Sequence, residues 1–284
     1  METKQIETPD SLSWYVEQFS PSKDSSKAAE HLVLIPSGEG DCYNLRKIAT
    51  MLSNHFGYSV TTFDMPGFSR TTGPPEAVEE VTPRLLAKQV AALLDVLGIG
   101  TVSIWGSSSG GSTALGLLAL CPERVRCAII HEVPFDIPPF KEWQQQPDET
   151  IIANCQQMFK YGFIEEANSG REKWDALGED YHKRLEKNYV TWIKNYPGHL
   201  EVAGQEYATP EILTRRPVFW TVGALSSKEI WGRNWEFAEK AGLKVNAEVL
   251  ECLHFPHVTI PEKLVDWIRD CIEEVKDQRV STTL

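Results

Sequence analysis

The amino-acid sequence predicts an α/β fold with a mostly parallel central sheet, flanking helices and an inserted all-helical block. Two observations support this fold class. Short apolar runs typical of buried strands alternate with amphipathic helical segments, a pattern that favours βαβ units and right-handed crossovers. The alternation stops after Pro134 and resumes at Val218, which indicates that helices interrupt the sheet.

The first half of the chain contains most of the predicted strands. His31–Ile35 is a continuous apolar run typical of a fully buried strand, and Leu12–Phe19 alternates as a half-buried strand does. The polar segment Ser20–Lys27 between them is predicted to be a loop. Further strands are expected at 59–63, 101–105 and 126–130, and helices at 43–54, 82–97 and 109–120.

Residues 135–216 are polar, aromatic and helical in pattern, and none of their segments is typical of a strand. We expect this block to form a helical cap over the carboxyl ends of the strands, where open α/β sheets bind their ligands. Residues 1–134 and 217–284 then form the core. In its second part we expect strands at 218–222 and 247–250, helices at 228–241 and 262–275, and a frayed tail from Lys276.

The net charge and the cysteines of the chain indicate which kinds of partner and which cellular compartment to expect. The 284 residues carry a formal net charge of -12, and an acidic surface repels the phosphates of nucleic acids and of anionic membranes. We therefore expect a small-molecule ligand, no nucleic-acid partner and no membrane partner. The six cysteines form no Cys-x-x-Cys pair and the chain starts without a secretory signal, so we expect reduced thiols in a cytoplasmic protein. Neither a metal nor a cofactor is predicted, and the oligomeric state, including a homodimer, stays open.

A short glycine- and serine-rich run lies between the predicted strand 101–105 and the helix that follows it. The run, Gly106-Ser107-Ser108-Ser109-Gly110, fits the Gly-x-Ser-x-Gly elbow that carries the nucleophile of the α/β-hydrolase fold. The turn is so tight that flanking side chains would collide, and it places a serine hydroxyl at a helix N-terminus, where negative charge is favoured. Only Ser108 has glycine two residues before and after it, so it is the predicted nucleophile. The alternative is a plain loop in which Ser109 or Ser112 caps the helix.

The catalytic base of this fold is a histidine on the loop that follows the last strand. Two of the seven histidines, His254 and His257, lie in that region of the sequence. We favour His254, which comes first after the predicted strand 247–250. His257 is expected to be a packed or helix-capping residue.

The acid of the triad is expected at an uncommon place. In many proteins of this fold it follows the penultimate strand, but no carboxylate follows the predicted strand 218–222 before Glu229. Glu132 instead comes shortly after the apolar run 126–130, at the end of a strand that neighbours the nucleophile strand. A carboxylate there can accept a hydrogen bond from the imidazole Nδ1–H and hold the tautomer that faces the serine. The alternative is a surface glutamate at the start of a loop.

Acyl transfer also needs backbone N–H groups that hold the negative oxygen of the tetrahedral intermediate. One is expected from Ser109, directly after the nucleophile. The other is expected from the loop 36–41 after the first buried strand, where Gly38 allows a close backbone approach. The alternative for this loop is an ordinary β-turn. Asp64 is expected to stabilise the turn after the strand 59–63 rather than to join the triad.

Several longer motifs closely resemble those of the fungal zearalenone lactonases, and the similarity covers nearly the whole chain, the predicted cap included. The resemblance rests on Thr61-Thr-Phe-Asp-Met-Pro-Gly67, Trp105-Gly-Ser-Ser-Ser-Gly110, His131-Glu-Val-Pro134, Lys187-Asn-Tyr189, Trp220-Thr-Val-Gly223 and His254-Phe-Pro256. Two residues beside the site depart from the family: Ser107 stands where relatives often carry Cys, and Ser37 where they often carry Asp.

The resemblance implies a Ser108–Glu132–His254 triad and a serine hydrolase that opens a resorcylic macrolactone, the class of ester to which the mycotoxin zearalenone belongs. It also implies that Gly38 and Ser109 donate to the oxyanion and contact the substrate. A third substrate contact is expected from Trp192 in the predicted cap. From the residues alone, the alternative is that Trp192 packs in the hydrophobic core of the cap. The rival functions are a general carboxylesterase, a carbon–carbon bond hydrolase with the same triad, and a small-molecule receptor with slow turnover.

Overall fold

The computed structural model describes residues 1–284 except 22–29, 80, 136–137, 197–205 and 283–284, so most of the predicted loop Ser20–Lys27 lies outside the described residues. An eight-stranded sheet in the order β1-β2-β4-β3-β5-β6-β7-β8 forms its centre. Strand β2 pairs antiparallel with β1 and β4, and the other neighbours pair parallel, which confirms the predicted fold class. The strands are β1 (Glu2–Glu7), β2 (Ser13–Phe19), β3 (His31–Ile35), β4 (Ser59–Phe63), β5 (Val102–Ser107), β6 (Val125–His131), β7 (Val218–Thr221) and β8 (Val245–Asn246).

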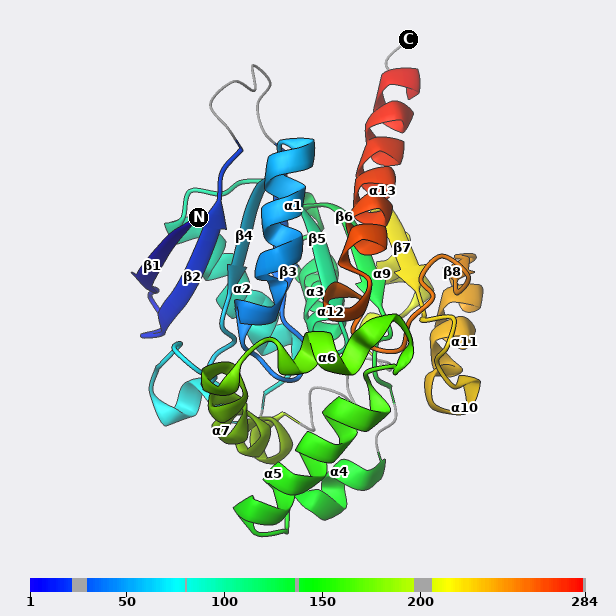
Figure 1. Ribbon diagram of the computed structural model, residues 1–284. Coiled ribbons are helices and arrows are strands. Elements are labelled where there is room, and N and C mark those ends of the chain that lie inside the picture. Colours follow the sequence, from blue (N-terminus) through cyan, green and yellow to red (C-terminus); the bar gives the residue numbers. More distant parts are fainter. Residues whose placement is uncertain (22–29, 80, 136–137, 197–205, 283–284) are drawn as a thin grey trace.

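Helices flank both faces of the sheet (Figure 1). In β3, Leu32 and Leu34 belong to the hydrophobic core on the side of α1 (Arg46–Phe56) and α13 (Pro261–Thr282). Val33 and Ile35 belong to the core on the side of α2 (Pro83–Val96) and α3 (Ser109–Leu120). Successive side chains of a strand point to opposite faces, and because both faces are covered the strand is a continuous apolar run. The helices outside the predicted cap are η1 (Cys42–Leu45), α1 (Arg46–Phe56), η2 (Pro75–Val78), α2 (Pro83–Val96), α3 (Ser109–Leu120), η3 (Pro122–Arg124), α10 (Lys228–Trp231), α11 (Arg233–Lys240), α12 (Pro256–Thr259) and α13 (Pro261–Thr282).

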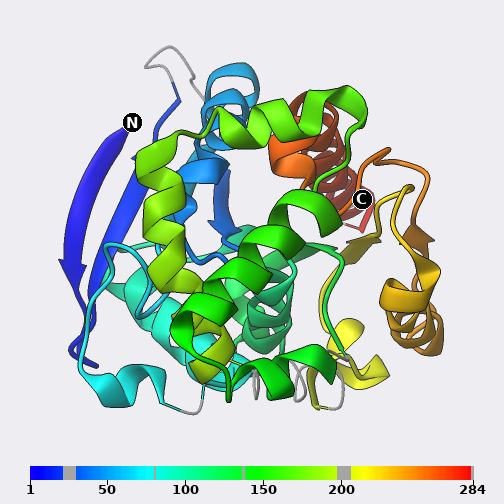
Figure 2. The same cartoon turned by 60° about the horizontal axis from the view of Figure 1, so that its bottom comes forward.

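The described residues of the predicted cap region form helices joined by turns and short loops, and none of these residues is in a strand. Helices α4 to α7 gather beyond the carboxyl ends of the parallel strands, below the sheet in Figure 1 and in front of it in Figure 2. Helix α9 contacts α3 of the flanking layer. The division of the chain after residues 134 and 216 stays a prediction. The helices are α4 (Pro138–Trp143), α5 (Asp148–Gln157), the π-helix η4 (Met158–Gly162), η5 (Ala167–Ser169), α6 (Gly170–Asp175), α7 (Glu179–Asn195) and α9 (Pro210–Leu213).

The structure corrects the sequence-based prediction at the sheet edges. The sequence does not predict strand β1, because its residues are mostly polar, yet the strand pairs with β2 from Ser13 to Gln18. The predicted strand 247–250 is wrong: the edge strand is Val245–Asn246, which pairs only with the last residues of β7. Leu250 is fully buried without being in a strand, so its apolar character reflects packing of a loop against the α13 side of the sheet.

Two helices also differ from the prediction. The expected helix 228–241 is divided at Gly232 into α10 and α11. Helix α13 does not end at Val275 with a frayed tail but continues to Thr282, because the segment from Lys276 has no glycine or proline to stop it.

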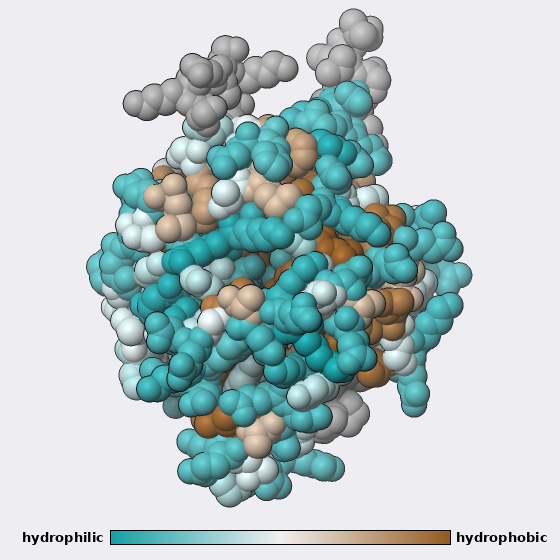
Figure 3. Space-filling model, in the orientation of Figure 1, coloured by the Kyte–Doolittle hydropathy of each residue, from teal (hydrophilic) through white to brown (hydrophobic). Residues whose placement is uncertain are grey.

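On the face seen in Figure 3, hydrophilic residues dominate the surface and apolar residues form scattered patches. No helix among the described residues is long and apolar enough to cross a membrane. All six cysteines are free thiols, and all except Cys121 are buried.

Candidate active site

Ser108 lies in a strained turn between β5 and α3, where the sequence places the elbow. Its φ of 53° and ψ of −125° form a backbone conformation that a residue with a Cβ rarely adopts. The flanking glycines let the turn close: a Cβ on Gly106 would lie 2.5 Å from the Gly110 carbonyl oxygen, and a Cβ on Gly110 would lie 2.4 Å from the Ile35 carbonyl oxygen. Ser108 is thereby held at the N-terminus of α3, at the positive end of the helix dipole.

The structure brings His254 and Glu132 into direct contact. His254 Nδ1 lies 2.6 Å from Glu132 Oε2, and the other carboxylate oxygen accepts a hydrogen bond from the Gly223 N–H at 2.8 Å. Glu132 follows β6 in a left-handed conformation, with a φ of 45° and no exposed surface. This backbone conformation directs the carboxylate toward His254 rather than along the direction of β6. The Ser108 N–H donates to the His131 carbonyl oxygen, which ties the end of β5 to the end of β6.

The electrostatics favour a charged Glu132 beside a neutral His131. Burial alone would raise the pKa of the Glu132 carboxyl, but the positive charge that His131 carries when it is protonated at low pH and the hydrogen bond with His254 outweigh burial, so this pKa lies below its usual value. Burial lowers the pKa of His131 to about 4, and its Nδ1 lies 3.0 Å from Thr221 Oγ1. At neutral pH the site therefore holds a carboxylate that can orient and stabilise an imidazolium on His254.

Aromatic rings hold the imidazole of His254 in place. The Trp231 ring stacks on it at a centroid distance of 4.6 Å with 17° between the planes, and the Phe163 ring lies 4.4 Å away. The His254 N–H also donates to the Phe163 carbonyl oxygen at 3.1 Å. His254 Nε2 has no hydrogen-bond partner among the described residues, so it is free to take a proton. Neither aromatic residue could be predicted from the sequence, because nothing in the residues around Trp231 or Phe163 links them to a histidine far along the chain.

Gly38, Ser109 and Trp192 lie together beside the elbow. Trp192 Nε1–H donates to Ser109 Oγ at 3.3 Å. A Cβ on Gly38 would lie 2.5 Å from Trp192 Cε2, so the indole covers this glycine closely. The cap thus contacts both residues that the sequence predicts as oxyanion donors.

The other carboxylates and the second histidine that the sequence offers for the acid and the base lie away from the Glu132–His254 pair. Both oxygens of the buried Asp64 accept hydrogen bonds from Arg70, and its Oδ1 also accepts one from the Cys42 N–H. Glu229 is exposed in α10. His257 is buried beside Asn44 Nδ2, and burial holds the pKa of this histidine well below its usual value.

One group of side chains has the spacing to hold a metal ion among the residues that the structure describes. His131, Glu132 and His254 can each offer an atom within 4.8 Å of the others. Glu132 and His254 are already hydrogen-bonded to each other, so a metal there would compete with that contact.

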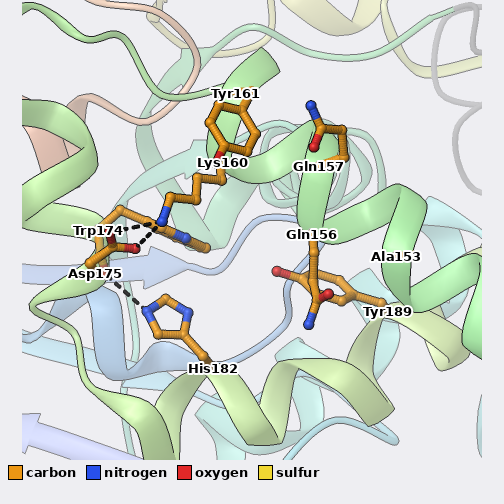
Figure 4. Close-up of a pocket in the computed structure, with 9 residues that line it drawn as sticks. All are labelled: Ala153, Gln156, Gln157, Lys160, Tyr161, Trp174, Asp175, His182 and Tyr189. Carbon is orange, nitrogen blue, oxygen red and sulfur yellow. Dashed lines mark hydrogen bonds and ion pairs between the residues drawn. The ribbon is translucent and has the colours of Figure 1, made fainter.

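A separate cavity of about 400 Å³ opens among α5, η4, α6 and α7 of the predicted cap region. Figure 4 shows the Tyr189 hydroxyl and the His182 ring pointing into it, with a Lys160–Asp175 ion pair at its rim. The Tyr189 ring packs on Phe159, and Phe159 packs on Trp192. A chain of aromatic contacts thus links the cavity to the Trp192 indole that covers Gly38. The cavity is lined by Ala153, Gln156, Gln157, Lys160, Tyr161, Trp174, Asp175, His182 and Tyr189.

Sequence comparison finds relatives over nearly the whole chain. The chain is 37% identical over 265 residues to a zearalenone hydrolase of Cladophialophora bantiana, a match that covers 93% of this chain and 94% of that protein. It is 35% identical over 268 residues to a zearalenone hydrolase of Bionectria ochroleuca, covering 93% and 95%. Residues 30–167 match the family described as alpha/beta hydrolase fold.

Solved structures share the architecture at low sequence identity. A putative acyltransferase from Salmonella enterica superimposes with a TM-score of 0.76 at 19% identity, covering 96% of this chain and 95% of that one. The enol-lactonase from Burkholderia xenovorans superimposes with a TM-score of 0.73 at 15% identity, covering 95% and 100%. At these identities the similarity establishes the fold.

Proposed function

Because the chain belongs to the zearalenone hydrolase family of the α/β-hydrolase fold, we propose that it opens a resorcylic macrolactone through an acyl-enzyme on Ser108. The observation that carries this proposal is the contact of His254 Nδ1 with the Glu132 carboxylate, next to the strained serine elbow, where Ser107 Oγ lies 3.5 Å from the His254 carbonyl oxygen. A hydrolase of this fold needs a nucleophile, an oriented base and a place for the oxyanion, and these residues can supply all three.

In the first half of the reaction, Ser108 Oγ attacks the ester carbonyl carbon while His254 Nε2 takes the hydroxyl proton. The Glu132 carboxylate accepts the Nδ1–H hydrogen bond and stabilises the imidazolium that forms. The carbonyl oxygen becomes an oxyanion that accepts hydrogen bonds from the N–H groups of Gly38 and Ser109. When the tetrahedral intermediate collapses, the ring C–O bond breaks and the alkoxide leaves with the proton from His254.

In the second half, water releases the acyl group from Ser108. His254 removes a proton from the water as it attacks the acyl carbon, and the same two N–H groups hold the second oxyanion. The Ser108 Oγ then leaves with the proton from His254. The product is an open-chain hydroxy acid, and the free enzyme is restored without a redox step.

Aromatic residues of the cap support a large, weakly polar substrate. Trp192 lies over Gly38 with its indole N–H beside Ser109, where it can contact the ring of a bound lactone. The side chains of Phe140 and Phe159 pack on Trp192 with centroid distances of 4.7 and 5.8 Å. Such surfaces suit an aromatic macrolactone better than a charged metabolite. The free, mostly buried thiols support a cytoplasmic site of action.

Incubation with zearalenone tests the proposal, with mass spectrometry to detect an acid heavier than the substrate by one water. We expect ring opening by the wild-type protein and none by Ser108→Ala. Ser112→Ala is the matched control, because its buried hydroxyl has no hydrogen-bond partner among the described residues. Rapid turnover of p-nitrophenyl butyrate without lactone opening would assign the protein to general esterases. Tight zearalenone binding with only a single slow turnover would assign it to receptors.

A further inference from the structure

The sequence of the loop that carries the proposed oxyanion donor Gly38 allows more than one backbone conformation. Gly38-Glu39-Gly40 has glycine on both sides of one residue, and glycine adopts both signs of φ with little cost. Neither glycine can be replaced easily, since a Cβ on Gly38 would meet Trp192 and Gly40 has a φ of +66° with Phe68 directly beside it. An oxyanion hole accelerates a reaction only when its donors are oriented in advance. This loop therefore needs a restraint from outside itself.

One helix of the cap supplies contacts along the whole loop. Arg184, Asn188 and Trp192 follow one another at intervals of four residues on α7, so their side chains form a stripe on one face of the helix. Trp192 covers Gly38 and bonds to Ser109, as described above. The other two residues of the stripe contact the loop further along the chain.

Asn188 restrains a single peptide group of the loop. Its Nδ2 donates to the Glu39 carbonyl oxygen at 2.7 Å. The N–H of the same peptide group, which belongs to Gly40, donates to the Ser37 carbonyl oxygen at 3.1 Å. The peptide is held on both sides, so it cannot rotate without losing both bonds, and the turn 37–40 keeps the conformation that presents Gly38.

The orientation of the Asn188 amide is itself determined by its surroundings. Asn188 is fully buried, its Nδ2 donates to Ser69 Oγ at 2.8 Å, and its Oδ1 accepts from the Ser69 N–H at 2.9 Å. Ser69 Oγ donates to Asp41 Oδ2 at 2.7 Å, and Arg184 Nε donates to the same oxygen at 2.8 Å. The buried Asp41 thus links the first residue of the stripe to the second. Its other oxygen accepts from Arg70 and from the Tyr43 N–H, which anchors the network in the core.

We propose that Asn188, supported by Arg184, is a positioning residue for the oxyanion hole. Contact of α7 with the loop 37–41 holds the Gly38 N–H toward the reacting carbonyl, although neither side chain touches the substrate. The inference rests on the proposed function, because it requires an oxyanion that forms beside Ser108. It predicts that loss of the Asn188 contact impairs the stabilisation of the tetrahedral intermediate and leaves binding of the substrate nearly unchanged.

The test is a comparison of wild-type protein with Asn188→Asp and Asn188→Ala. Asn188→Asp keeps an acceptor for the Ser69 N–H and loses the donor to the Glu39 carbonyl oxygen. Complete removal of an oxyanion donor lowers kcat by about 10²–10³-fold. If the turn presents the donor in only one molecule in ten to one hundred, kcat falls by roughly 10- to 100-fold, because only that fraction of molecules can stabilise the oxyanion. We expect a loss of that size in kcat for zearalenone, with KM within about three-fold of wild type.

A boronic acid separates positioning from a general loss of structure. An aryl boronic acid forms a tetrahedral adduct on the serine oxygen, and one of its oxygens occupies the oxyanion hole. Its affinity for the Asn188 variants should fall by the same factor as kcat. The affinity of zearalenone for Ser108→Ala should be the same with and without Asn188→Asp. A merely structural role would weaken both ligands alike.

Variants of Arg184 keep the proposal testable even where Asn188 variants fail to fold, because this side chain is partly exposed. Arg184→Gln should lower kcat and boronate affinity in parallel, and Arg184→Lys should restore part of both because it keeps the charge beside Asp41. Lys187→Ala, at an exposed position of the same helix, is the control and should match wild type.

Wild-type kcat and wild-type boronate affinity in folded Asn188→Asp and in Arg184→Gln would overturn the inference while leaving the proposed function intact. Undiminished lactone opening by Ser108→Ala would overturn the proposed function and this inference with it.

Discussion

Replacement of Glu132 by glutamine is expected to give His254 the wrong tautomer. In the native site one carboxylate oxygen accepts from the Gly223 N–H at 2.8 Å and the other contacts His254 Nδ1 at 2.6 Å. A glutamine that keeps its oxygen toward Gly223 turns its NH₂ group toward Nδ1. The imidazole must then carry its proton on Nε2, where it cannot accept the proton of Ser108.

The opposite amide orientation does not rescue the variant. With the glutamine oxygen toward His254, the NH₂ group would face the Gly223 N–H, and two buried donors would meet without an acceptor. Such an unsatisfied buried donor costs about 1–3 kcal/mol, which favours the inactive orientation. A wrong tautomer in a serine–histidine–carboxylate site lowers kcat by about 10⁴-fold, which corresponds to about 5.5 kcal/mol of activation free energy.

The assay is initial-rate ring opening of zearalenone by Glu132→Gln, measured by liquid chromatography, together with thermal unfolding to show that the variant folds. Glu229→Gln is the matched control, since this glutamate is exposed in α10 and should leave kcat unchanged. A rate for folded Glu132→Gln within about ten-fold of wild type would refute the tautomer argument and move the acid to another residue.

Three further changes test other parts of the structure. Burial raises the pKa of the Glu39 carboxyl from 4.5 to about 7, so the stability that this group contributes is complete below pH 4.5 and is lost as the pH rises through 7. Relative to Glu39→Gln, the wild type should therefore lose about 3 kcal/mol of unfolding free energy between pH 4.5 and about pH 8. Urea titration measures this difference, and a difference that does not change with pH would contradict the prediction. Gly110→Ala should lower unfolding free energy by about 1–3 kcal/mol and reduce activity, because the new Cβ would lie 2.4 Å from a backbone oxygen of β3, whereas Gly100→Ala, with open space around it, should change neither. Trp231→Ala should lower kcat by roughly 10-fold, because His254 loses the ring that stacks on its imidazole, whereas Trp231→Phe should retain most of the activity. Equal rates for the two variants would argue against the stacking role.

The sequence could predict the parts of the site that local patterns mark. The position of Ser108 followed from glycine spacing between an apolar strand and a helix, and the structure places it in that strained turn. Glu132 was selected because no carboxylate follows β7 closely, and its side chain contacts His254 in the structure. Both inferences used positions at the ends of parallel strands, which meet at the same edge of a sheet.

Other features depend on contacts that no local pattern records. The rings of Trp231 and Phe163 reach His254 from different elements, and Asn188 contacts the loop 37–41 from a helix more than a hundred residues further along the chain. The short edge strand β8 was misplaced because a buried residue such as Leu250 is apolar whether it lies in a strand or in a packed loop.

The central claim is that Ser108 carries the acyl group during turnover, and peptide mass spectrometry of the acid-quenched reaction tests it most directly. The protein is mixed with zearalenone, quenched within the first turnover and digested, and the adduct is assigned within the Ser107–Ser109 run by fragmentation. We predict a substrate-derived acyl group on Ser108 that is absent from Ser108→Ala. An acyl group on Ser107 or Ser109, or undiminished ring opening by Ser108→Ala, would contradict the account.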